Sequence, residues 1–335
     1  MRKIRRLAAL LAVTATTVFG TATAASASPL RTTDLIAFVR GGNLFVAAGD
    51  SAPTQITTGG GYAWPRWAGA QRLGLIAYTH NGDVFVSTFS SRFGLTGTIQ
   101  LSSGAHAGAP SFSPSGLKVA FLDGTSTSGV LYVADISTTP PTITPVVGAA
   151  NAARQPQTVV RQRQTAVTPS LVGQFSPLIN SAAVAWSPNG TYIAFPGGDC
   201  LGIFDHCLSL LNLNTNEQTT VAAFSGGGDV REGYATVPAW SSDSKNLYWT
   251  QQNTDPLINN GNTISPLRIF KYRVGTQTAP NQWGRDGDSE IAPFSAGGVR
   301  FLLTVPVGNK AWIAESEGGV RTLLYPGYES NWVLN

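Results

Sequence analysis

The 335-residue sequence has few of the residues that most often carry catalysis or bind metals. It contains two cysteines, three histidines and one methionine, and only 12% of its residues are charged. It lacks a Gly-x-Ser-x-Gly nucleophile motif, a His-Glu-x-x-His zinc motif and a Gly-x-x-x-x-Gly-Lys-Ser phosphate-binding loop. These absences argue against the common serine hydrolases, zinc peptidases and P-loop nucleotide hydrolases.

Residues 1–27 have the composition of a secretory signal peptide. A basic start precedes a stretch of mostly Ala, Leu and Val over residues 7–19, and Ala25-Ser26-Ala27 is suited to cleavage before Ser28. The residue directly after the cleavage position is Ser28 and not a cysteine, which argues against lipid attachment, and no later run is apolar and long enough to span a membrane. We therefore expect residues 28–335 to be a soluble, secreted monomer.

Removal of residues 1–27 changes the charge balance. The whole chain has 22 basic and 18 acidic residues, and residues 1–27 hold four of the basic residues and none of the acidic ones. The remaining chain therefore carries equal numbers of both signs. A near-neutral chain gives no electrostatic reason to expect nucleic acid or an anionic membrane as a partner.

The two cysteines, Cys200 and Cys207, lie seven positions apart in an insertion between two predicted strands. In an oxidising compartment an even pair in a short loop predicts a disulfide, and a metal site or a redox pair is the alternative. Because the enclosed loop is short, the expected stabilisation is only about 2–3 kcal/mol.

One short pattern recurs along the chain. An aromatic residue is followed seven residues later by an aliphatic or aromatic residue, and the residues between them are rich in Ser, Pro, Asn, Asp and Gly. The pairs are Phe112 and Val119, Trp186 and Ile193, Trp240 and Leu247, and Phe294 and Phe301, with a looser copy at Trp67 and Ile76. Turns of this composition join antiparallel strands, and repetition at this scale predicts stacked copies of one unit.

Each unit continues with two further strands. A third strand follows, as in Leu131-Tyr132-Val133, and then a weaker fourth strand rich in Thr and Gln, as in residues 217–220. Four short antiparallel strands describe a propeller blade. Six second-strand positions can be counted, at Ile36, Ile76, Val119, Ile193, Leu247 and Phe301. The sequence therefore predicts an all-β fold, a six-bladed β-propeller of four-stranded antiparallel blades.

The two ends of the chain are predicted to share one blade. The chain begins on a second strand at Asp34 and ends on a first strand at residues 331–334, so this C-terminal strand would close the ring. The interval from Val119 to Ile193 is 74 residues, longer than its neighbours. It predicts an insertion at about residues 138–180, or a seventh blade as the alternative. Residues 151–168 within it would form an exposed extension or a basic docking strip.

Two of the repeats carry a more specific pattern. Ala109-Pro110-Ser111-Phe112-Ser113-Pro114-Ser115-Gly116 and Val237-Pro238-Ala239-Trp240-Ser241 resemble the propeller repeats of TolB and its relatives, over nearly the whole of residues 28–335. The resemblance implies a six-bladed propeller that presents interaction surfaces. TolB itself has an additional α/β domain before its propeller, for which this sequence has no room, so TolB's partners are not extended to this chain. Peptidases that join a propeller to a catalytic domain are not expected for the same reason.

Polar residues precede the first strand of several predicted blades, where such segments gather at one mouth of the central channel. They are Tyr62, His106, Glu232, Tyr234, Asp288, Glu290, Tyr328 and Glu329. The simplest interpretation is that they are solvated loop residues, and the alternative is a ligand site at the channel mouth. We expect no cofactor, and the alternative is a calcium ion, because the carboxylates of Asp286, Asp288 and Glu290 lie close together in sequence and could supply its oxygen ligands.

Two functions remain open. The first is a secreted, non-catalytic propeller that binds a protein or cell-envelope component through one face. The alternative is a metal-assisted lyase or hydrolase that acts on carbohydrate or a phosphate ester at the channel mouth, with His106, Glu232 and Glu290. The few acidic residues and the single histidine near the mouth favour the first function.

Overall fold

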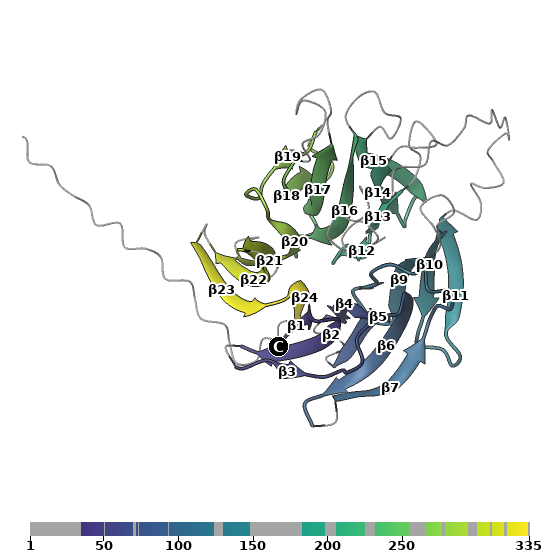
Figure 1. Cartoon of the computed structure of the whole chain (residues 1–335). Helices are drawn as coiled ribbons and strands as arrows, with labels where there is room; N and C mark the ends of the chain where they lie inside the picture. The colour runs from purple at the N-terminus through teal and green to yellow at the C-terminus, as the bar shows by residue number, and fades with distance from the viewer. Residues whose placement is uncertain are drawn as a thin grey trace, which may run out of the picture.

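The structure is a computed structural model of the chain, and it describes residues 35–49, 51–69, 72, 74–92, 94–123, 130–147, 183–197, 206–224, 232–254, 265–276, 279–293, 300–308, 310–317 and 320–333. These residues form six four-stranded antiparallel sheets, which are arranged as the blades of a ring (Figure 1). The fold is a six-bladed β-propeller, as the sequence predicts.

In blades 2 to 6 the strands follow chain order from the centre of the ring outwards, and in blade 1 the C-terminal strand takes the innermost place. Blade 1 contains β24 (Tyr328–Val333), β1 (Leu35–Arg40), β2 (Asn43–Ala48) and β3 (Thr54–Gln55). Blade 2 contains β4 (Tyr62–Trp67), β5 (Leu75–His80), β6 (Asp83–Ser90) and β7 (Gly94–Gln100). Blade 3 contains β8 (Ser111–Phe112), β9 (Lys118–Asp123), β10 (Val130–Asp135) and β11 (Thr142–Val147).

The second half of the ring follows the same order. Blade 4 contains β12 (Ala185–Trp186), β13 (Tyr192–Pro196), β14 (His206–Asn212) and β15 (Glu217–Phe224). Blade 5 contains β16 (Glu232–Trp240), β17 (Asn246–Thr254), β18 (Arg268–Arg273) and β19 (Asn281–Gln282). Blade 6 contains β20 (Ser289–Pro293), β21 (Arg300–Val307), β22 (Lys310–Glu317) and β23 (Val320–Pro326).

The sequence repeat corresponds to a direct cross-strand pairing. The aromatic residue on the first strand lies opposite its partner on the second strand in four blades, namely Trp67 and Ile76, Phe112 and Val119, Trp186 and Ile193, and Trp240 and Leu247. In blade 6 the residue opposite Phe301 is Pro293, and Phe294 lies outside the described residues. The seven-residue interval of blades 3, 4 and 5 therefore reflects turns of equal length between strands in the same register, whereas the interval between paired residues is nine in blade 2 and eight in blade 6.

The turns between the first and second strands show why these residue types recur. In blade 4 the Ser187 hydroxyl donates to Asn189 Oδ1 at 2.7 Å and accepts from the Tyr192 N–H at 2.8 Å. Gly190 has a φ of +77°, which glycine adopts at little cost. In blade 5 the equivalent position is Ser244, with a φ of +60°. The polar side chains thus satisfy the backbone of the turn while a left-handed residue closes it.

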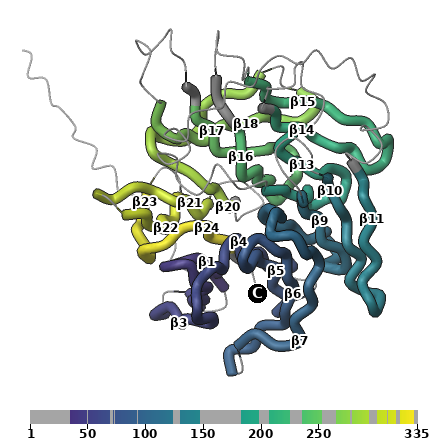
Figure 2. Tube along the Cα trace, turned by 45° about the vertical axis from the view of Figure 1, so that its right-hand side comes forward, coloured from purple at the N-terminus to yellow at the C-terminus, as the bar shows by residue number. Residues whose placement is uncertain are grey.

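The C-terminal strand closes the ring, as predicted. β24 pairs antiparallel with β1, and Trp332 lies opposite Ile36 while Val333 lies opposite Leu35. Figure 2 shows this C-terminal strand beside the strands of the N-terminal blade. Closure pairs the inner edge of the first blade and ties both ends of the described chain into one ring.

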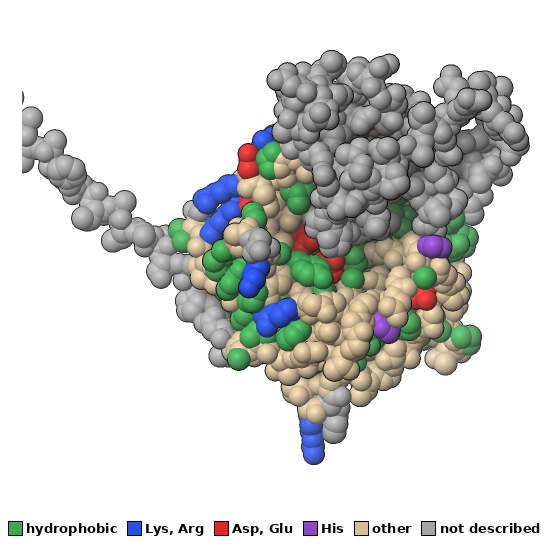
Figure 3. Space-filling view, viewed as in Figure 1, with side chains coloured by type: hydrophobic (Ala, Val, Ile, Leu, Met, Phe, Trp, Pro, Cys, Tyr) green, Lys and Arg blue, Asp and Glu red, His purple; other side chains and the backbone are tan. Residues whose placement is uncertain are grey.

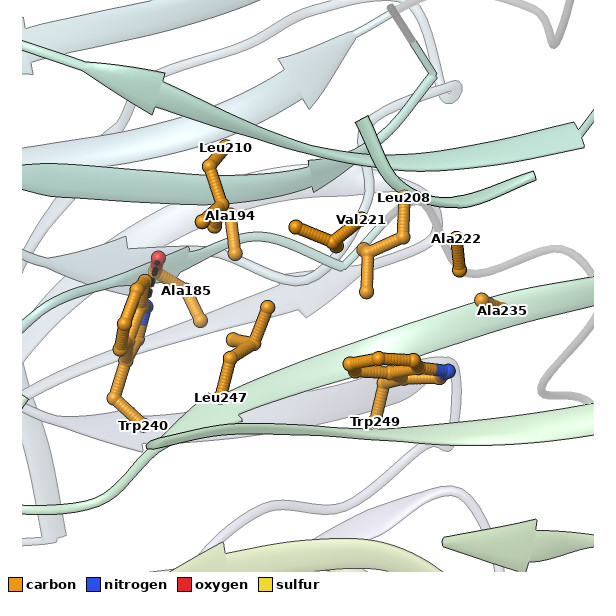
Figure 4. Close-up of a cluster of buried hydrophobic side chains, with 10 residues drawn as sticks. All are labelled: Ala185, Ala194, Leu208, Leu210, Val221, Ala222, Ala235, Trp240, Leu247 and Trp249. Carbon is orange, nitrogen blue, oxygen red and sulfur yellow. Dashed lines mark hydrogen bonds between the residues drawn. The ribbon is translucent and has the colours of Figure 1, made fainter. Parts of the chain in front are cut away.

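The hydrophobic core is divided among the interfaces between neighbouring blades. At the interface of blades 4 and 5, Leu247 and Trp249 are fully buried and face Leu208 and Leu210 (Figure 4). The Trp240 indole N–H donates to the Ala185 carbonyl at 3.0 Å across the same interface. Because each blade packs only on its neighbours, the stability of the ring depends on every interface being formed.

Some sequence predictions fall outside the described residues. The signal peptide at residues 1–27 is one of them, and Cys200 of the predicted disulfide is another. Residues 142–147 of the predicted insertion form β11, the outer strand of blade 3, and its residues 148–180 are outside the part of the chain that the structure describes. In the part of the chain that the structure describes, no helix is long and apolar enough to cross a membrane.

Candidate functional site

The innermost strands of four blades share an unusual backbone feature near the centre of the ring. Trp64, Val237, Glu290 and Glu329 have φ values of +54°, +50°, +51° and +55°. At each of these positions the pairing between first and second strands shifts register. Positive φ is costly for residues other than glycine and persists where the surrounding structure enforces it, so these bulges point to a constrained centre.

Six positions, one from each blade, define what we call the inner ring. In each blade, one first-strand residue lies opposite the second-strand position predicted from the sequence, as Trp67 lies opposite Ile76 in blade 2. The inner-ring position is three residues before that first-strand residue. The inner ring consists of Glu329, Trp64, Ala109, Ala183, Val237 and Glu290, in the order of blades 1 to 6, and all six residues are buried. The four apolar members form a single cluster. The two glutamates lie on the neighbouring blades 6 and 1.

Glu290 connects three elements of the closed ring. Its Oε2 accepts hydrogen bonds from the Thr304 hydroxyl at 2.6 Å and from the Glu329 N–H at 2.5 Å. Its own N–H donates to the Thr250 hydroxyl of blade 5 at 2.9 Å. The side chain is only 5% exposed. Glu290 therefore joins blade 6 to blade 5 on one side and to the closing strand on the other.

Glu329 continues this connection into blade 2. Its Oε2 accepts from the Trp64 N–H at 2.6 Å, and the side chain is 3% exposed. Two residues further on, Asn331 Oδ1 accepts from the Trp67 N–H at 2.9 Å. Arg66, between these two tryptophans, is partly exposed, and its guanidinium lies near both carboxylates. Figure 3 shows acidic side chains in the hollow at the centre of one face.

Burial dominates the electrostatics of this pair. Burial raises the pKa of Glu329 to about 8, and repulsion from Glu290 adds to the shift. Burial also raises the pKa of Glu290, although hydrogen bonds from Thr304 and Glu329 and the charge of Arg66 act against it. Burial lowers the pKa of Arg66, and the negative charges of Glu329 and Glu290 act in the opposite direction. Burial thus favours the protonated form of both carboxyl groups, and the charge of Arg66 acts against it.

The structure corrects the solvated-loop interpretation for three of the predicted residues. Glu290 and Glu329 are buried, and Asp288 is 1% exposed, with both of its oxygens bound by the Arg321 guanidinium. The sequence analysis expected these residues in loops. Glu290 lies instead within β20 and Glu329 within β24, and these strands are the innermost of their blades. Their burial is tolerated because hydrogen bonds and ion pairs compensate the lost hydration.

The other predicted residues are distributed around the same end of the ring. Tyr62 stacks on His80 with ring centroids 4.0 Å apart, and Tyr328 is partly buried beside them at the blade 1–blade 2 interface. His106 is exposed in the connection before β8, on the opposite side of the ring from Glu290. The backbones of Glu232 and Tyr234 belong to β16, and their side chains lie outside the described residues.

The predicted calcium ligands have separate partners. Asp286 forms an exposed ion pair with Arg268 at 2.7 Å, Asp288 binds Arg321, and Glu290 accepts from Thr304 and Glu329. The described residues contain no group of three His, Cys, Asp or Glu side chains placed to hold a metal ion. These contacts do not test calcium binding, which stays a prediction. They show that the three carboxylates already interact with different groups.

Sequence reasoning missed Arg66, Thr250, Thr304 and Asn331. Each lies inside a strand, where a polar residue in an alternating pattern is ordinarily assigned to the exposed face. The available signal was the shared offset from the repeat, which places Glu329 in register with Trp64 and Val237. For Glu290 this signal is wrong by one position, because Pro293 and not Phe294 lies opposite Phe301. This arrangement can hold blades 5, 6, 1 and 2 together, because one oxygen of each carboxylate accepts hydrogen bonds from neighbouring blades or strands.

Comparison with known proteins agrees with this fold. No known protein family and no curated protein matches the sequence. Among solved structures, TolB from Acinetobacter baumannii superposes with a TM-score of 0.58 at 15% identity, covering 89% of this chain and 66% of that chain. A structure assigned as TolB from Agrobacterium tumefaciens gives a TM-score of 0.53 at 12% identity, covering 90% and 92%. A chain of a nidogen/laminin complex gives 0.51 at 7% identity, covering 90% and 97%.

At these identities the likeness concerns architecture. The chain spans just under two thirds of the Acinetobacter TolB chain, so nothing about the whole of that protein is carried over. The resemblance of the sequence repeats and the superposition of the blades indicate the same fold. The protein therefore has the TolB-like six-bladed β-propeller fold.

Proposed function

We propose that this protein is an exported, non-catalytic propeller that binds a protein or a cell-envelope component through one face. The observation that carries the proposal is the difference between the two faces of the ring. On what we call the loop face, each first strand begins and each second strand ends, as at Tyr62 and His80. On the turn face, first strands join second strands through turns such as Ser187 to Gly190.

The connections on the two faces differ in length. On the turn face, every connection between strands has between two and seven residues. On the loop face, 37 residues separate Val147 from Ala185 and 13 separate Thr254 from Arg268. Long connections on one face of a rigid scaffold are where recognition is ordinarily located, because they vary without disturbing the core.

Side chains at the loop face of blades 1 and 2 also suit an interface. Tyr62 and His80 are stacked and half-buried there, and the Arg40 guanidinium lies 4.8 Å from the centre of the Phe45 ring. Arg40 is fixed by a hydrogen bond from its Nε to the Pro326 carbonyl at 2.8 Å. Aromatic residues and arginine that are already held in place lose little freedom on binding, and they are enriched at interface centres.

The enzymatic alternative gains no support from the described residues. A lyase or hydrolase would need carboxylates that face an open pocket. Glu290 and Glu329 instead accept hydrogen bonds from the protein itself and are buried. His106 lies on blade 3 and Glu290 on blade 6, so two of the three residues that were considered for catalysis are on opposite sides of the ring.

Affinity capture from envelope fractions tests the proposal. The bait is the exported protein, compared with His80→Ala on the loop face and with a deletion of residues 151–168, which belong to the long connection between Val147 and Ala185. Lys118→Gln is the matched control, because Lys118 is exposed on the turn face at the start of β9. We expect a component that the wild type and the control both retain and that at least one loop-face variant loses. Equal recovery by all four proteins, or no specific component, would contradict the proposal.

A further inference from the structure

The turn face carries a cavity of its own, at the outer end of blade 5. Its volume is about 370 Å³, and it is lined by Asp243, Lys245, Asn246, Lys271, Arg273, Asn281 and Trp283. These residues come from the turn between β16 and β17, from the ends of β17 and β18 that adjoin the turn face, and from β19 and the residue that follows it. The volume falls in the range of pockets that hold small molecules.

Strand pairing places the polar lining on one face of the sheet. Arg273 lies opposite Asn246, and Lys271 lies opposite Asn281. Lys271 and Arg273 are two positions apart on β18, so their side chains project from the same face. The Lys271 ammonium is 5.8 Å from the centre of the Tyr248 ring on that face, which holds the cation by a cation–π contact.

The cavity has an excess of positive charge. Three cations line it, from Lys245, Lys271 and Arg273, against one carboxylate, that of Asp243. Asp243 Oδ1 accepts from the Ser241 hydroxyl at 2.6 Å and from the Lys245 N–H at 3.0 Å, so this carboxylate is committed to the turn. Residues 28–335 contain only four lysines and balanced charge overall, so two of the four lining one cavity is a local concentration.

One wall of the cavity is a rigid aromatic side chain. Trp283 is half-buried and packs on Phe301 and Tyr248, with ring centroids 4.6 Å and 5.5 Å away. Its remaining surface, with the amides of Asn246 and Asn281, can accommodate the uncharged part of a ligand, such as a sugar ring with hydroxyl groups.

We propose that this cavity binds the phosphate group of a small phosphorylated ligand. Lys245, Lys271 and Arg273 contact the phosphate oxygens, and Trp283 with the two asparagines contacts the organic part. Charge-assisted hydrogen bonds to oxyanions are stronger than neutral ones, and three cations around a cavity of this size suit a dianion. The cavity opens at the turn face, so the proposal does not depend on what the loop face binds.

Isothermal titration calorimetry with inorganic phosphate, glucose 6-phosphate, glucose and glucuronate tests the proposal. We expect both phosphates to bind and glucose not to bind, with affinity that falls as sodium chloride is raised. Tighter binding of glucose 6-phosphate than of phosphate would assign a contact to the organic part, and equal binding would leave the phosphate group as the whole ligand. Either result supports the site.

Variants then locate the binding. Lys271→Gln and Arg273→Gln should each weaken phosphate binding about tenfold, because each removes one charge-assisted contact. Lys118→Gln, an exposed lysine on the turn face of blade 3, should bind like the wild type. Thermal unfolding of each variant shows whether the ring is intact. Absence of binding at millimolar phosphate, equal affinity in all variants, or tighter binding of glucuronate than of glucose 6-phosphate would overturn the proposal.

Discussion

The inner ring uses different chemistry on its two sides. On what we call the closure side, Glu290, Glu329 and the Trp64 backbone are linked by hydrogen bonds across blades 6, 1 and 2. On the opposite side, Ala109, Ala183 and Val237 occupy the equivalent positions of blades 3, 4 and 5 and pack as an apolar cluster. The polar side is therefore the one where the two ends of the chain meet.

The difference has a physical reason. Blades 3, 4 and 5 each take their four strands from one continuous stretch of chain, so a short turn joins the inner strand of each blade to its second strand, and the inner strand needs only nondirectional burial at the centre. β24 reaches blade 1 without such a connection to β1, and it must select one register among several. Directional hydrogen bonds to two neighbouring blades fix that register, because a slipped strand would leave buried carboxylates without partners.

The largest expected effect is loss of the closing strand. Deletion of residues 331–335 removes the pairing of Trp332 with Ile36 and the hydrogen bond from the Trp67 N–H to Asn331. We expect a protein that aggregates or lacks a cooperative thermal transition, as measured by size-exclusion chromatography and calorimetry. Deletion of residue 335 alone, which lies beyond β24, is the control. A folded, monomeric deletion variant would show that closure does not require this pairing.

Truncation of a residue on each side compares the two chemistries directly. Glu290→Ala leaves the Thr304 hydroxyl and the Glu329 N–H without their acceptor, and we expect a loss of about 3 kcal/mol in the free energy of unfolding. Val237→Ala on the opposite side removes two methyl groups and should cost about 1 kcal/mol. Urea denaturation measures both. An equal or reversed ranking would mean that the polar side contributes no special constraint.

The predicted disulfide would be a covalent restraint on the apolar side. Cys207 is buried in β14 of blade 4, and Cys200 lies outside the described residues. If the two cysteines are joined, replacing both by serine should lower the free energy of unfolding by about 2 kcal/mol. Mass spectrometry of the exported protein with and without reductant checks the bond itself. Two thiols that alkylate freely without reductant would contradict it.

The pH dependence of stability separates the closure side from the rest. Burial raises the pKa of Glu329 from 4.5 to about 8, so the folded protein retains a proton that the unfolded chain releases. Its contribution to stability is therefore complete below about pH 4.5 and is lost as pH rises towards 8.

Glu329→Gln mimics the protonated carboxyl group and should remove this dependence. At pH 9 we expect its melting temperature to exceed that of the wild type by about 2–6 °C, with little difference at pH 5. Val237→Ala, on the apolar side, should shift the melting temperature equally at both pH values. A constant difference between Glu329→Gln and the wild type across this range would contradict the raised pKa.

Calcium gives the smallest expected effect. Arg268 and Arg321 already bind Asp286 and Asp288, so an added cation would have to displace them. We expect millimolar calcium to change the melting temperature by less than about 1 °C. A larger increase that Asp288→Asn abolishes would show instead that the closure side is organised by a metal ion.

Local sequence determined the blades. The repeat interval, the Ser-Pro-x-Gly turns and the alternating strands predicted six blades, because a tight turn fixes which residues lie opposite each other within a few positions. Closure by residues 331–334 also followed from counting strands. These features depend on short separations along the chain, where residue type and backbone geometry are closely related.

Only the tertiary structure decided the centre and the cavity. Trp64 and Glu329 are 265 positions apart, and no local pattern predicts that the N–H of one meets the carboxylate of the other. The polar residues before the first strands were predicted to share one end of the ring, but their burial depends on where the bulges occur in each inner strand. The position of Trp283 beside this cavity likewise depends on its packing against Phe301 of blade 6. Sequence thus determined the repeating unit, and the closed ring determined which side chains of different units meet.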